Sequence, residues 1–498
     1  MSSLQKMSEF LARASAQPGG ISTQEGTRNA LSSLFDMDSF VCLDQKVVSR
    51  PFSQTFDRPP VEGDGVVVGY GTIGGRLVFA ASQDASVYGG SIGRAHAMKI
   101  VKVIEMAISS GAPFVALYSS GGARIEEGIL ALEGLGGILA ALERAKGIIP
   151  LMGAILGPCP GGLALAAAKS DMLFFVKDVS GLYMNSPRII ELKEKDISLH
   201  GKIGSSEMHQ SFLGLSSFTL PDEESCMDKI RELLEYVPVQ AGDSMAFSRE
   251  TTTFDCANRT SDVLNQMASE SDSKGISIRT VFSEVADSNR YLEISSEYGI
   301  DTCVALAKLD GMTVGLIGNQ DARISITGAR KISKFVRFCS DNMIPIVTFT
   351  NAEGFAIGTE SENAGLVEAA ADLVSAFYAS EVPRIGILVG KAIGTAYLTM
   401  NSKMLGADMV FAWPTAQIAV MSADTAANIL FRSQIELSED PIAKRQEVTD
   451  AYASEISDPS IAAGLGQIDE IILPSTTRPH VISAIDILLS AYPLVEKE

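Results

Sequence analysis

The sequence has few histidines and lacks the motifs on which metal and nucleophilic catalysis commonly rely. Its 498 residues include four scattered histidines without HExxH or similar spacing, so no metal site is predicted. No GxSxG elbow or GxxxxGK[ST] loop occurs either. Six cysteines are present without a CxxC pair, which suits a reducing compartment better than a disulfide framework. Chemistry that depends on a zinc ion, a serine nucleophile or a P-loop is therefore poorly supported.

Positive charge and long apolar runs are also scarce. Lysine and arginine number 40 against 60 aspartates and glutamates, a formal net charge of −20. This balance argues against nucleic acid or an anionic membrane surface as a direct partner. No apolar run approaches the roughly 20 residues of a membrane span, and Met1 to Gly20 lack the apolar core of a signal peptide. We expect a cytoplasmic, soluble protein.

The chain does contain an internal repeat. The length of the chain also predicts two or more domains. Each half begins with two apolar runs around a glycine turn, continues through a helix and a short buried strand, and opens into a glycine loop. In the first half these are the hairpin 66–79, the helix 94–110, the strand 113–118 and the loop 119–124; in the second, 304–317, 328–341, 345–349 and 351–355. The link to the helix passes through Gln83-Asp84 in one half and Gln320-Asp321 in the other.

A second strand-to-helix step follows in both halves. Strands at 148–156 and 384–389 precede glycine turns, apolar helices and further strands at 171–175 and 408–412. Strands that alternate with helices in this way predict an α/β fold with parallel strands. We expect two tandem domains, residues 1–240 and 241–498, joined through a polar stretch between about 235 and 275.

The glycine turns are the candidate catalytic elements. Gly161-Gly162 and Gly394-Thr395-Ala396 lie at matched places, each where a strand hands over to a helix. Backbone N–H groups there favour a negatively charged oxygen, and they stabilise the oxyanion that a thioester carbonyl forms as it becomes an enolate. A single Gly-Gly before a helix more often serves tight packing, but the repetition in both halves favours the functional interpretation.

Two other patterns are weaker. Ala97-Met98-Lys99-Ile100 approximates the sequence at which biotin is attached, but its periodicity places it inside a helix rather than at an exposed hairpin tip. Gly69-Tyr70-Gly71 leads into another strand, which argues against a dinucleotide fingerprint.

Several motifs, in order along residues 30 to 490, together resemble the carboxyltransferases of biotin-dependent acyl-CoA carboxylases and decarboxylases. Those of the first half are Ser82-Gln83-Asp84, Gly89-Gly90-Ser91-Ile92-Gly93, residues 120–128 (SGGARIEEG) and Gly157-Pro158-Cys159. Those of the second half are residues 334–339 (KFVRFC), Ile344-Pro345, Leu405-Gly406-Ala407-Asp408, residues 412–416 (AWPTA), Ile418-Ala419-Val420-Met421 and residues 468–472 (IDEII).

The resemblance implies two crotonase-like ββα-repeat domains, a hexamer, and an acyl-CoA-binding N-terminal domain beside a biotin-binding C-terminal domain. By position, Gly161 and Gly162 would stabilise the acyl-CoA enolate, while Thr395 and Ala396 would hold the ureido oxygen of biotin. The residues that it assigns to the CoA substrate are Gly121, Gly122, Ala123, Arg124 and Leu398. Biotin would arrive on a carrier protein, and a biotin carboxylase or a membrane decarboxylase subunit would complete the complex. The latter partner would bring the chain to the membrane surface.

Departures from the family pattern qualify this assignment. Ser119 stands where the family usually has Asp, Pro160 where it has Ala, Thr395 where it has Gly, and Leu398 where it has Asp. Residues 318–321 (GNQD) replace the family's Ala-Asn-Gln-Pro. Leu398 leaves the acyl chain open, and residues 398–403 look closer to the decarboxylase branch. Two alternatives remain, a CoA-thioester hydratase or hydrolase of the same fold and a non-catalytic assembly subunit.

Three further side chains have two interpretations each. An anionic CoA ester needs local positive charge, for which Arg124 and Lys391 are candidates, or else they form surface ion pairs. Trp413, the single tryptophan, is expected in the core rather than against biotin.

Overall fold

The computed structural model describes Met7 and residues 25–49, 60–195, 203–238 and 255–491. The chain divides into two compact units: unit 1 comprises Met1–Met208 and Thr219–Glu232, and unit 2 comprises His209–Phe218 and Leu233–Glu498. The predicted boundary between residues 240 and 241 lies outside the described residues and stays a prediction. Apart from Met7, the N-terminal segment 1–20 lies outside them as well.

Unit 1 is built on a seven-stranded sheet in the order β1-β2-β3-β4-β5-β7-β9. The hairpin strands β2 and β3 are antiparallel, whereas β3, β4, β5 and β7 are parallel. Gly74 and Gly75 both have positive φ, 57° and 76°, which a two-residue turn between twisted strands requires. The strands are β1 Val41–Leu43, β2 Val66–Ile73, β3 Arg76–Gln83, β4 Phe114–Tyr118, β5 Leu151–Ile155, β7 Met172–Val176 and β9 Phe218–Leu220, with β6 Pro158–Pro160 and β8 Gly181–Tyr183 in a separate pair.

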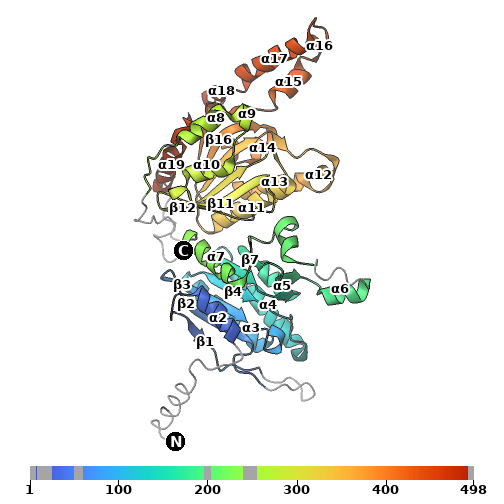
Figure 1. Cartoon of the computed structure of the whole chain (residues 1–498), viewed down its shortest axis with the longest axis vertical. Coiled ribbons are helices and arrows are strands. Elements are labelled where there is room, and N and C mark those ends of the chain that lie inside the picture. The colour runs from blue at the N-terminus through green and yellow to red at the C-terminus, as the bar shows by residue number, and fades with distance from the viewer. Residues whose placement is uncertain (1–6, 8–24, 50–59, 196–202, 239–254, 492–498) are drawn as a thin grey trace. The chain divides into compact units, whose positions relative to one another are not determined.

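Helices α3 and α4 pack together over this sheet (Figure 1). They approach closely because Gly134 of α4 faces Ala97 of α3, where a Cβ would lie 2.7 Å from the Ala97 Cβ. Helix α3 ends at Gly111, whose φ of 60° is the left-handed conformation common after a helix. The helices of unit 1 are α2 Glu25–Leu34, α3 Arg94–Ser110, α4 Ile129–Ala145, α5 Gly162–Ala167 and α6 Pro187–Glu194, and α7 Glu223–Tyr236 continues into unit 2.

Unit 2 repeats the plan with an eight-stranded sheet in the order β10-β11-β12-β14-β16-β17-β19, with β18 paired to β16. Again the first pairs are antiparallel and the pairs from β12 onward are parallel. The strands are β10 Tyr291–Glu293, β11 Thr302–Leu309, β12 Met312–Asn319, β14 Ile346–Ala352, β16 Arg384–Ile393, β17 Met409–Ala412, β18 Gln417–Ala419 and β19 Glu470–Ile471, with β13 Arg323–Ile324 and β15 Gly354–Phe355 in a separate pair.

The core of unit 2 lies between this sheet and α8, α10 and α19, and Phe282, Phe349 and Trp413 are buried in it. Trp413 is fully buried and its Nε1 donates to Thr477 Oγ1 at 3.0 Å, which confirms the predicted core position. Figure 1 shows α15, α16 and α17 standing away from the rest of the unit. Its helices are α8 Asp262–Ser269, α9 Ser271–Lys274, α10 Ile278–Val285, α11 Ile326–Asp341, α12 Thr359–Asn363, α13 Leu366–Tyr378, α14 Gly394–Thr399, α15 Ala423–Leu430, α16 Arg432–Glu436, α17 Pro441–Ile456, α18 Pro459–Gly464 and α19 Thr477–Ala491.

Several elements differ from those predicted, and three of the differences have a clear physical reason. Helix α11 begins at Ile326 rather than 328, because Ser325 caps it by accepting a hydrogen bond from Gly328 N at 2.9 Å. Strand β16 continues to Ile393 because its last residues pair with β18. Part of the expected polar junction is helical, since Leu264 and Ala268 of α8 pack into the core of unit 2.

Candidate active site

The glycine turn of unit 1 follows β6 and starts α5. Gly161 has φ 61° and ψ −129°, a conformation that residues other than glycine rarely adopt. Its own N–H donates to the Tyr183 carbonyl at 2.9 Å. Gly162 is the first residue of α5, so its N–H has no acceptor within the helix. Of the two predicted glycines, Gly162 is the one placed to donate to an incoming oxygen.

The loop 119–124 lies against the strand that leads into this turn. Ser120 N–H donates to the Pro158 carbonyl at 2.8 Å, and a Cβ on Gly122 would lie 3.3 Å from Pro160 Cγ. Gly121 is exposed, but its N–H donates to the Gly89 carbonyl at 2.7 Å, and Gly122 N–H donates to Ser120 Oγ at 3.0 Å. The structure thus brings the predicted CoA-binding loop and Gly161-Gly162 together, with the N–H groups of Ser120, Gly121 and Gly122 already satisfied.

Arg124 closes this loop from inside the unit. Its guanidinium is buried, and Nη1 donates to Asp64 Oδ1 and to Glu127 Oε1, both at 2.8 Å. Nη2 donates to the Ser91 carbonyl at 2.8 Å, and the guanidinium carbon lies 4.9 Å from the ring centre of Tyr88. Arg124 therefore forms an ion pair, as its alternative interpretation proposed, but a buried one rather than one on the surface.

Beneath the loop lies a set of buried polar side chains to which the sequence assigned no role at the site. Gln83 Oε1 accepts the N–H of Ser119 at 3.2 Å, and Gln83 Nε2 lies 3.2 Å from His96 Nε2. His96 Nδ1 lies 2.9 Å from the Asp64 carbonyl. Burial lowers the pKa of His96 to about 3, so the ring is neutral at neutral pH. A neutral ring that donates through Nδ1 accepts through Nε2, which orients the amide of Gln83.

Lys99 of α3 is also buried, and its Nζ donates to the carbonyls of Gly63 and Val66. Burial lowers its pKa to about 8. A side chain so enclosed cannot serve as a biotin attachment site, in agreement with the sequence interpretation.

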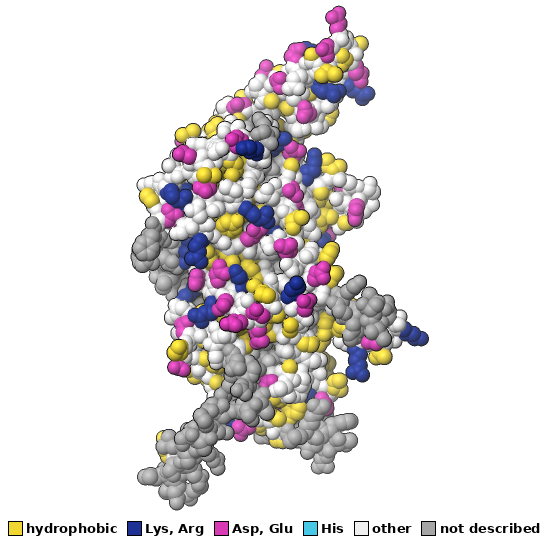
Figure 2. All heavy atoms as spheres, viewed as in Figure 1, with side chains coloured by type: hydrophobic (Ala, Val, Ile, Leu, Met, Phe, Trp, Pro, Cys, Tyr) yellow, Lys and Arg dark blue, Asp and Glu magenta, His cyan; other side chains and the backbone are white. Residues whose placement is uncertain are grey.

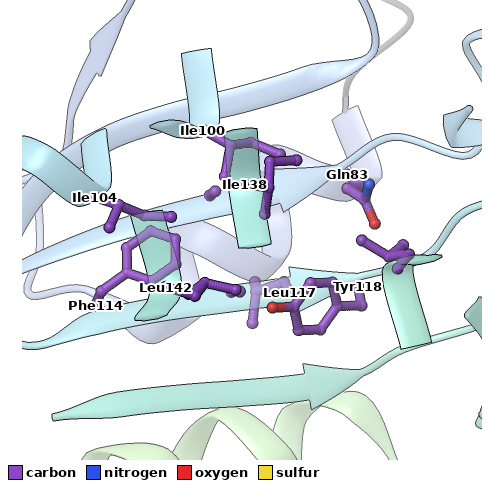
Figure 3. A pocket seen from close by; sticks show the side chains of 11 residues that line it. Gln83, Ile100, Ile104, Phe114, Leu117, Tyr118, Ile138 and Leu142 are labelled. Atoms are coloured by element: carbon purple, nitrogen blue, oxygen red, sulfur yellow. The ribbon is translucent and has the colours of Figure 1, made fainter. Parts of the chain in front are cut away.

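A small apolar space lies between the sheet of unit 1 and helices α3 and α4 (Figure 3). Gln83 and Tyr118 are its polar side chains, and Leu163 of α5 joins its wall directly after Gly162. Burial raises the pKa of Tyr118 above its usual value, so its hydroxyl stays protonated. This space is part of the core on which the glycine turn rests. The other lining residues are Ala81, Ile100, Ile104, Phe114, Ala116, Leu117, Ile138 and Leu142.

The second glycine turn, in unit 2, follows β16 and starts α14. Gly394 has φ 60°, close to the value at Gly161. Thr395 is exposed, Ala396 is buried and Leu398 is partly exposed on α14. The N–H groups of Gly394, Thr395 and Ala396, the first residues of the helix, have no acceptor within it. Lys391, three residues before Gly394, forms an ion pair with Glu353.

Both cations that the sequence offered for an anionic substrate are thus paired with carboxylates. On the face that Figure 2 shows, lysine and arginine side chains are scattered among acidic ones rather than gathered in one patch. Within the described residues no group of three or more His, Cys, Asp or Glu side chains could hold a metal ion. In the same part of the chain, none of the helices is both long and apolar enough to cross a membrane.

Asn319 and Asn351 form the counterpart of Gln83 and Ser119 in unit 2. Asn351 N–H donates to Asn319 Oδ1 at 2.8 Å. The sequence paired Gln83 with Gln320, but both hairpin strands are eight residues long and end at Gln83 and Asn319, so that pairing was one residue out of register. The sequence signal that identifies this pair of residues is the polar residue at the end of each second hairpin strand.

Comparison with known proteins assigns this architecture. The carboxyl transferase domain matches residues 24–493. The chain belongs to the carboxyl transferase family. It is 38% identical over 467 residues to the methylmalonyl-CoA decarboxylase subunit alpha of Veillonella parvula, covering 93% of this chain and 90% of that protein. This carboxyltransferase is also 35% identical over 473 residues to the mitochondrial propionyl-CoA carboxylase beta chain of Homo sapiens, covering 93% and 85%.

A solved structure agrees over almost the whole chain. Transcarboxylase 12S, described as a hexamer with methylmalonyl-coenzyme A and methylmalonic acid bound, has a TM-score of 0.90 at 31% identity, covering 99% of this carboxyltransferase and 97% of that chain. The family resemblance, the enzyme class and the crotonase-like α/β fold predicted from the sequence are therefore confirmed.

Proposed function

We propose that this carboxyltransferase moves a carboxyl group between biotin, carried on a partner protein, and a short-chain acyl-CoA of the propionyl or methylmalonyl type. The observation that carries the proposal is the matched pair of glycine turns, with φ of 61° at Gly161 and 60° at Gly394. Two sites that favour an oxygen anion suit a reaction with two carbonyl groups. The names of the relatives and the methylmalonyl-coenzyme A bound to transcarboxylase 12S support the acyl chain.

In unit 1, Gly162 N–H would donate to the thioester oxygen as negative charge builds up on it. Gly161 would shape the turn, since its own N–H is taken by Tyr183. Donors held in place before the reaction are worth more than donors that must reorganise. No side-chain base is needed at this site, because the proton leaves for the second substrate.

In unit 2, Thr395 and Ala396 would hold the ureido oxygen of biotin through their backbone N–H groups. Backbone N–H donors suit a carbonyl oxygen on which negative charge builds up during the transfer, and the exposed Thr395 makes the turn accessible. Biotin, when bound, supplies the carboxyl carrier and the acceptor for the substrate's α-proton. The Thr395 hydroxyl would add a donor where the family has glycine.

The remaining predicted contacts divide by placement. Gly121 and Ala123 would border the acyl-CoA, whereas Gly122 and Arg124 would shape the loop through their internal bonds. Leu398 would contact the acyl group or its neighbour through its partly exposed side chain.

We propose that the protein forms a hexamer, as transcarboxylase 12S does, and works in the cytoplasm. Its partners would be a biotin carboxyl carrier protein and either a biotin carboxylase or a membrane decarboxylase subunit. The decarboxylase relative from Veillonella parvula supports the second choice.

The test is decarboxylation of malonyl-, methylmalonyl- and glutaconyl-CoA by the purified protein with free biotin. Turnover that requires biotin is expected, and the preferred thioester identifies the substrate. Binding of the CoA esters without turnover at any biotin concentration would refute the proposal and favour an assembly subunit or other thioester chemistry.

A further inference from the structure

The two units share a side-chain device in addition to the glycine turns. Gln83 and Asn319 are the last residues of the second hairpin strands, and they are 236 positions apart, as are the first residues of β2 and β11, Val66 and Thr302. Both are carboxamides and both are buried. Each therefore occupies the same place in its half of the molecule.

Each carboxamide oxygen accepts a hydrogen bond from the backbone N–H at the equivalent position of its own unit. Gln83 receives that of Ser119 at 3.2 Å, and Asn319 receives that of Asn351 at 2.8 Å. Ser119 and Asn351 both lie five positions after the first residue of their strand, β4 or β14. The bond fixes the chain at the point where it leaves the sheet toward the site.

In unit 2 the Asn319 side chain forms hydrogen bonds with both the N–H and the carbonyl of Asn351. Asn319 Nδ2 donates to the Asn351 carbonyl and, at 2.8 Å, to the Asp321 carbonyl. Asn351 in turn accepts the Lys391 N–H on its Oδ1 at 2.9 Å. A Cβ on Gly390 would lie 2.3 Å from that Oδ1, so the glycine is needed for the side chain to reach. A chain of hydrogen bonds thus runs from Asn319 to the backbone three residues before Gly394.

In unit 1 the corresponding contact is with Gly157, which precedes Gly161 by four positions as Gly390 precedes Gly394. A Cβ on Gly157 would lie 2.5 Å from Ser119 Oγ. The hydrogen bond to the incoming strand comes from the next residue, Ser120 N–H to the Pro158 carbonyl at 2.8 Å. Behind Gln83 stands His96, which orients its amide.

We propose that Gln83 in unit 1 and the pair Asn319–Asn351 in unit 2 are positioning residues for the two glycine turns. Each carboxamide fixes the position of the glycine turn in its own unit and has no effect on the turn of the other unit. Because a shift of about 1 Å at a reacting group can cost on the order of 100-fold in rate, bonds of this kind decide how well the backbone donors are aimed. The inference rests on the proposed function for the identity of the two ligands.

The prediction that follows is a crossed pattern. Asn351→Ala removes the acceptor for Lys391 N–H, and Asn351→Asp retains it. Gln83→Met removes both bonds, and Gln83→Glu, protonated in its buried place, can still accept from Ser119 and donate to His96. We expect Asn351→Ala to raise the KM for free biotin about tenfold with little change for the CoA ester, and Gln83→Met to do the reverse. Asn351→Asp and Gln83→Glu should recover most of the loss.

Amide hydrogen exchange on the same proteins, without substrates, gives a readout independent of activity. Asn351→Ala should speed exchange in residues 391–396 and not in 157–163, and Gln83→Met the opposite. Faster exchange in both segments, in neither, or without the crossed KM change in an active enzyme would overturn the proposal. If the wild type shows no biotin-dependent turnover, the proposed function fails, and the exchange pattern with the affinity for the CoA ester still decides whether the carboxamides hold the turns.

Discussion

Arg124 and Asp64 form a buried ion pair 60 positions apart in the chain, with Nη1 and Oδ1 separated by 2.8 Å. Glu127 shares the same guanidinium and also accepts the Arg94 N–H at the start of α3 at 2.7 Å. The pair therefore joins the hairpin, the first helix and the loop beside Gly161. Burial raises the pKa of Asp64 and the arginine opposes that rise, so the carboxylate depends on its partner for its charge.

Arg124→Met should destabilise the protein by about 3–5 kcal/mol, because it leaves two buried carboxylates without their cation. The shift of the unfolding midpoint in urea measures this. Arg432→Met is the matched control, since Arg432 and Glu436 form a pair with side chains 76% and 62% exposed, and solvent screening leaves such a pair with little effect on stability. Equal losses in both variants would show that the buried Arg124 contributes no more to stability than an exposed arginine does.

Gly162→Pro should lower kcat about 100-fold or more by deleting one oxyanion donor. Proline suits the first position of a helix, and the backbone of Gly162 is outside the left-handed region, so the turn should be kept. Gly162→Ala is the control, because its Cβ meets the same flexible Leu135 side chain at 3.1 Å while the N–H remains. Steady-state kinetics with methylmalonyl-CoA and biotin compare the two. A similar loss in both would assign the effect to crowding rather than to the donor.

Stability should fall below neutral pH because of His96. Its pKa is lowered to about 3 in the folded protein by burial, whereas an unfolded histidine has a pKa of about 6.5. Below pH 6.5 the histidine therefore binds a proton in the unfolded chain but not in the native state. The free energy of unfolding decreases as the pH drops. Between pH 7.5 and 5.5 this group costs about 1.4 kcal/mol.

The measurement is chemical denaturation of the wild type and of His96→Gln at both pH values. The variant is expected to lose about 1.4 kcal/mol less than the wild type over this interval, whatever its absolute stability. Because the two proteins differ only at residue 96, the contributions common to both cancel in the difference. Identical pH dependence in the two proteins would mean that folding does not shift the pKa of His96.

Lys99 should resist amine acylation in the native protein. Its side chain is buried and its Nζ already donates to two carbonyls, so a reagent in water cannot reach the nitrogen. Lys46, whose side chain is 76% exposed, should react at once. Peptide mass spectrometry after brief treatment, with and without urea, tests this, and modification of native Lys99 at the rate of Lys46 would contradict the structure.

The sequence by itself determined the repeat, the α/β fold and the place of both glycine turns. Helix 94–110 was predicted with its observed bounds because α3 lies between Gly93 and Gly111, which are local signals. Apolar periodicity and glycine punctuation depend on neighbours along the chain, so they can be read without a structure.

Only the tertiary structure decided which polar side chains support the turns. Gln83 meets Ser119 across 36 positions and Asn319 meets Asn351 across 32, distances over which no local pattern relates two residues. The same holds for Arg124, whose sequence suggested a substrate contact while burial among Asp64, Glu127 and Tyr88 made it a link within the unit. The folded sheet brings these groups together and excludes water from them. That exclusion gives the hydrogen bonds and charges their strength, and the order of residues along the chain does not display it.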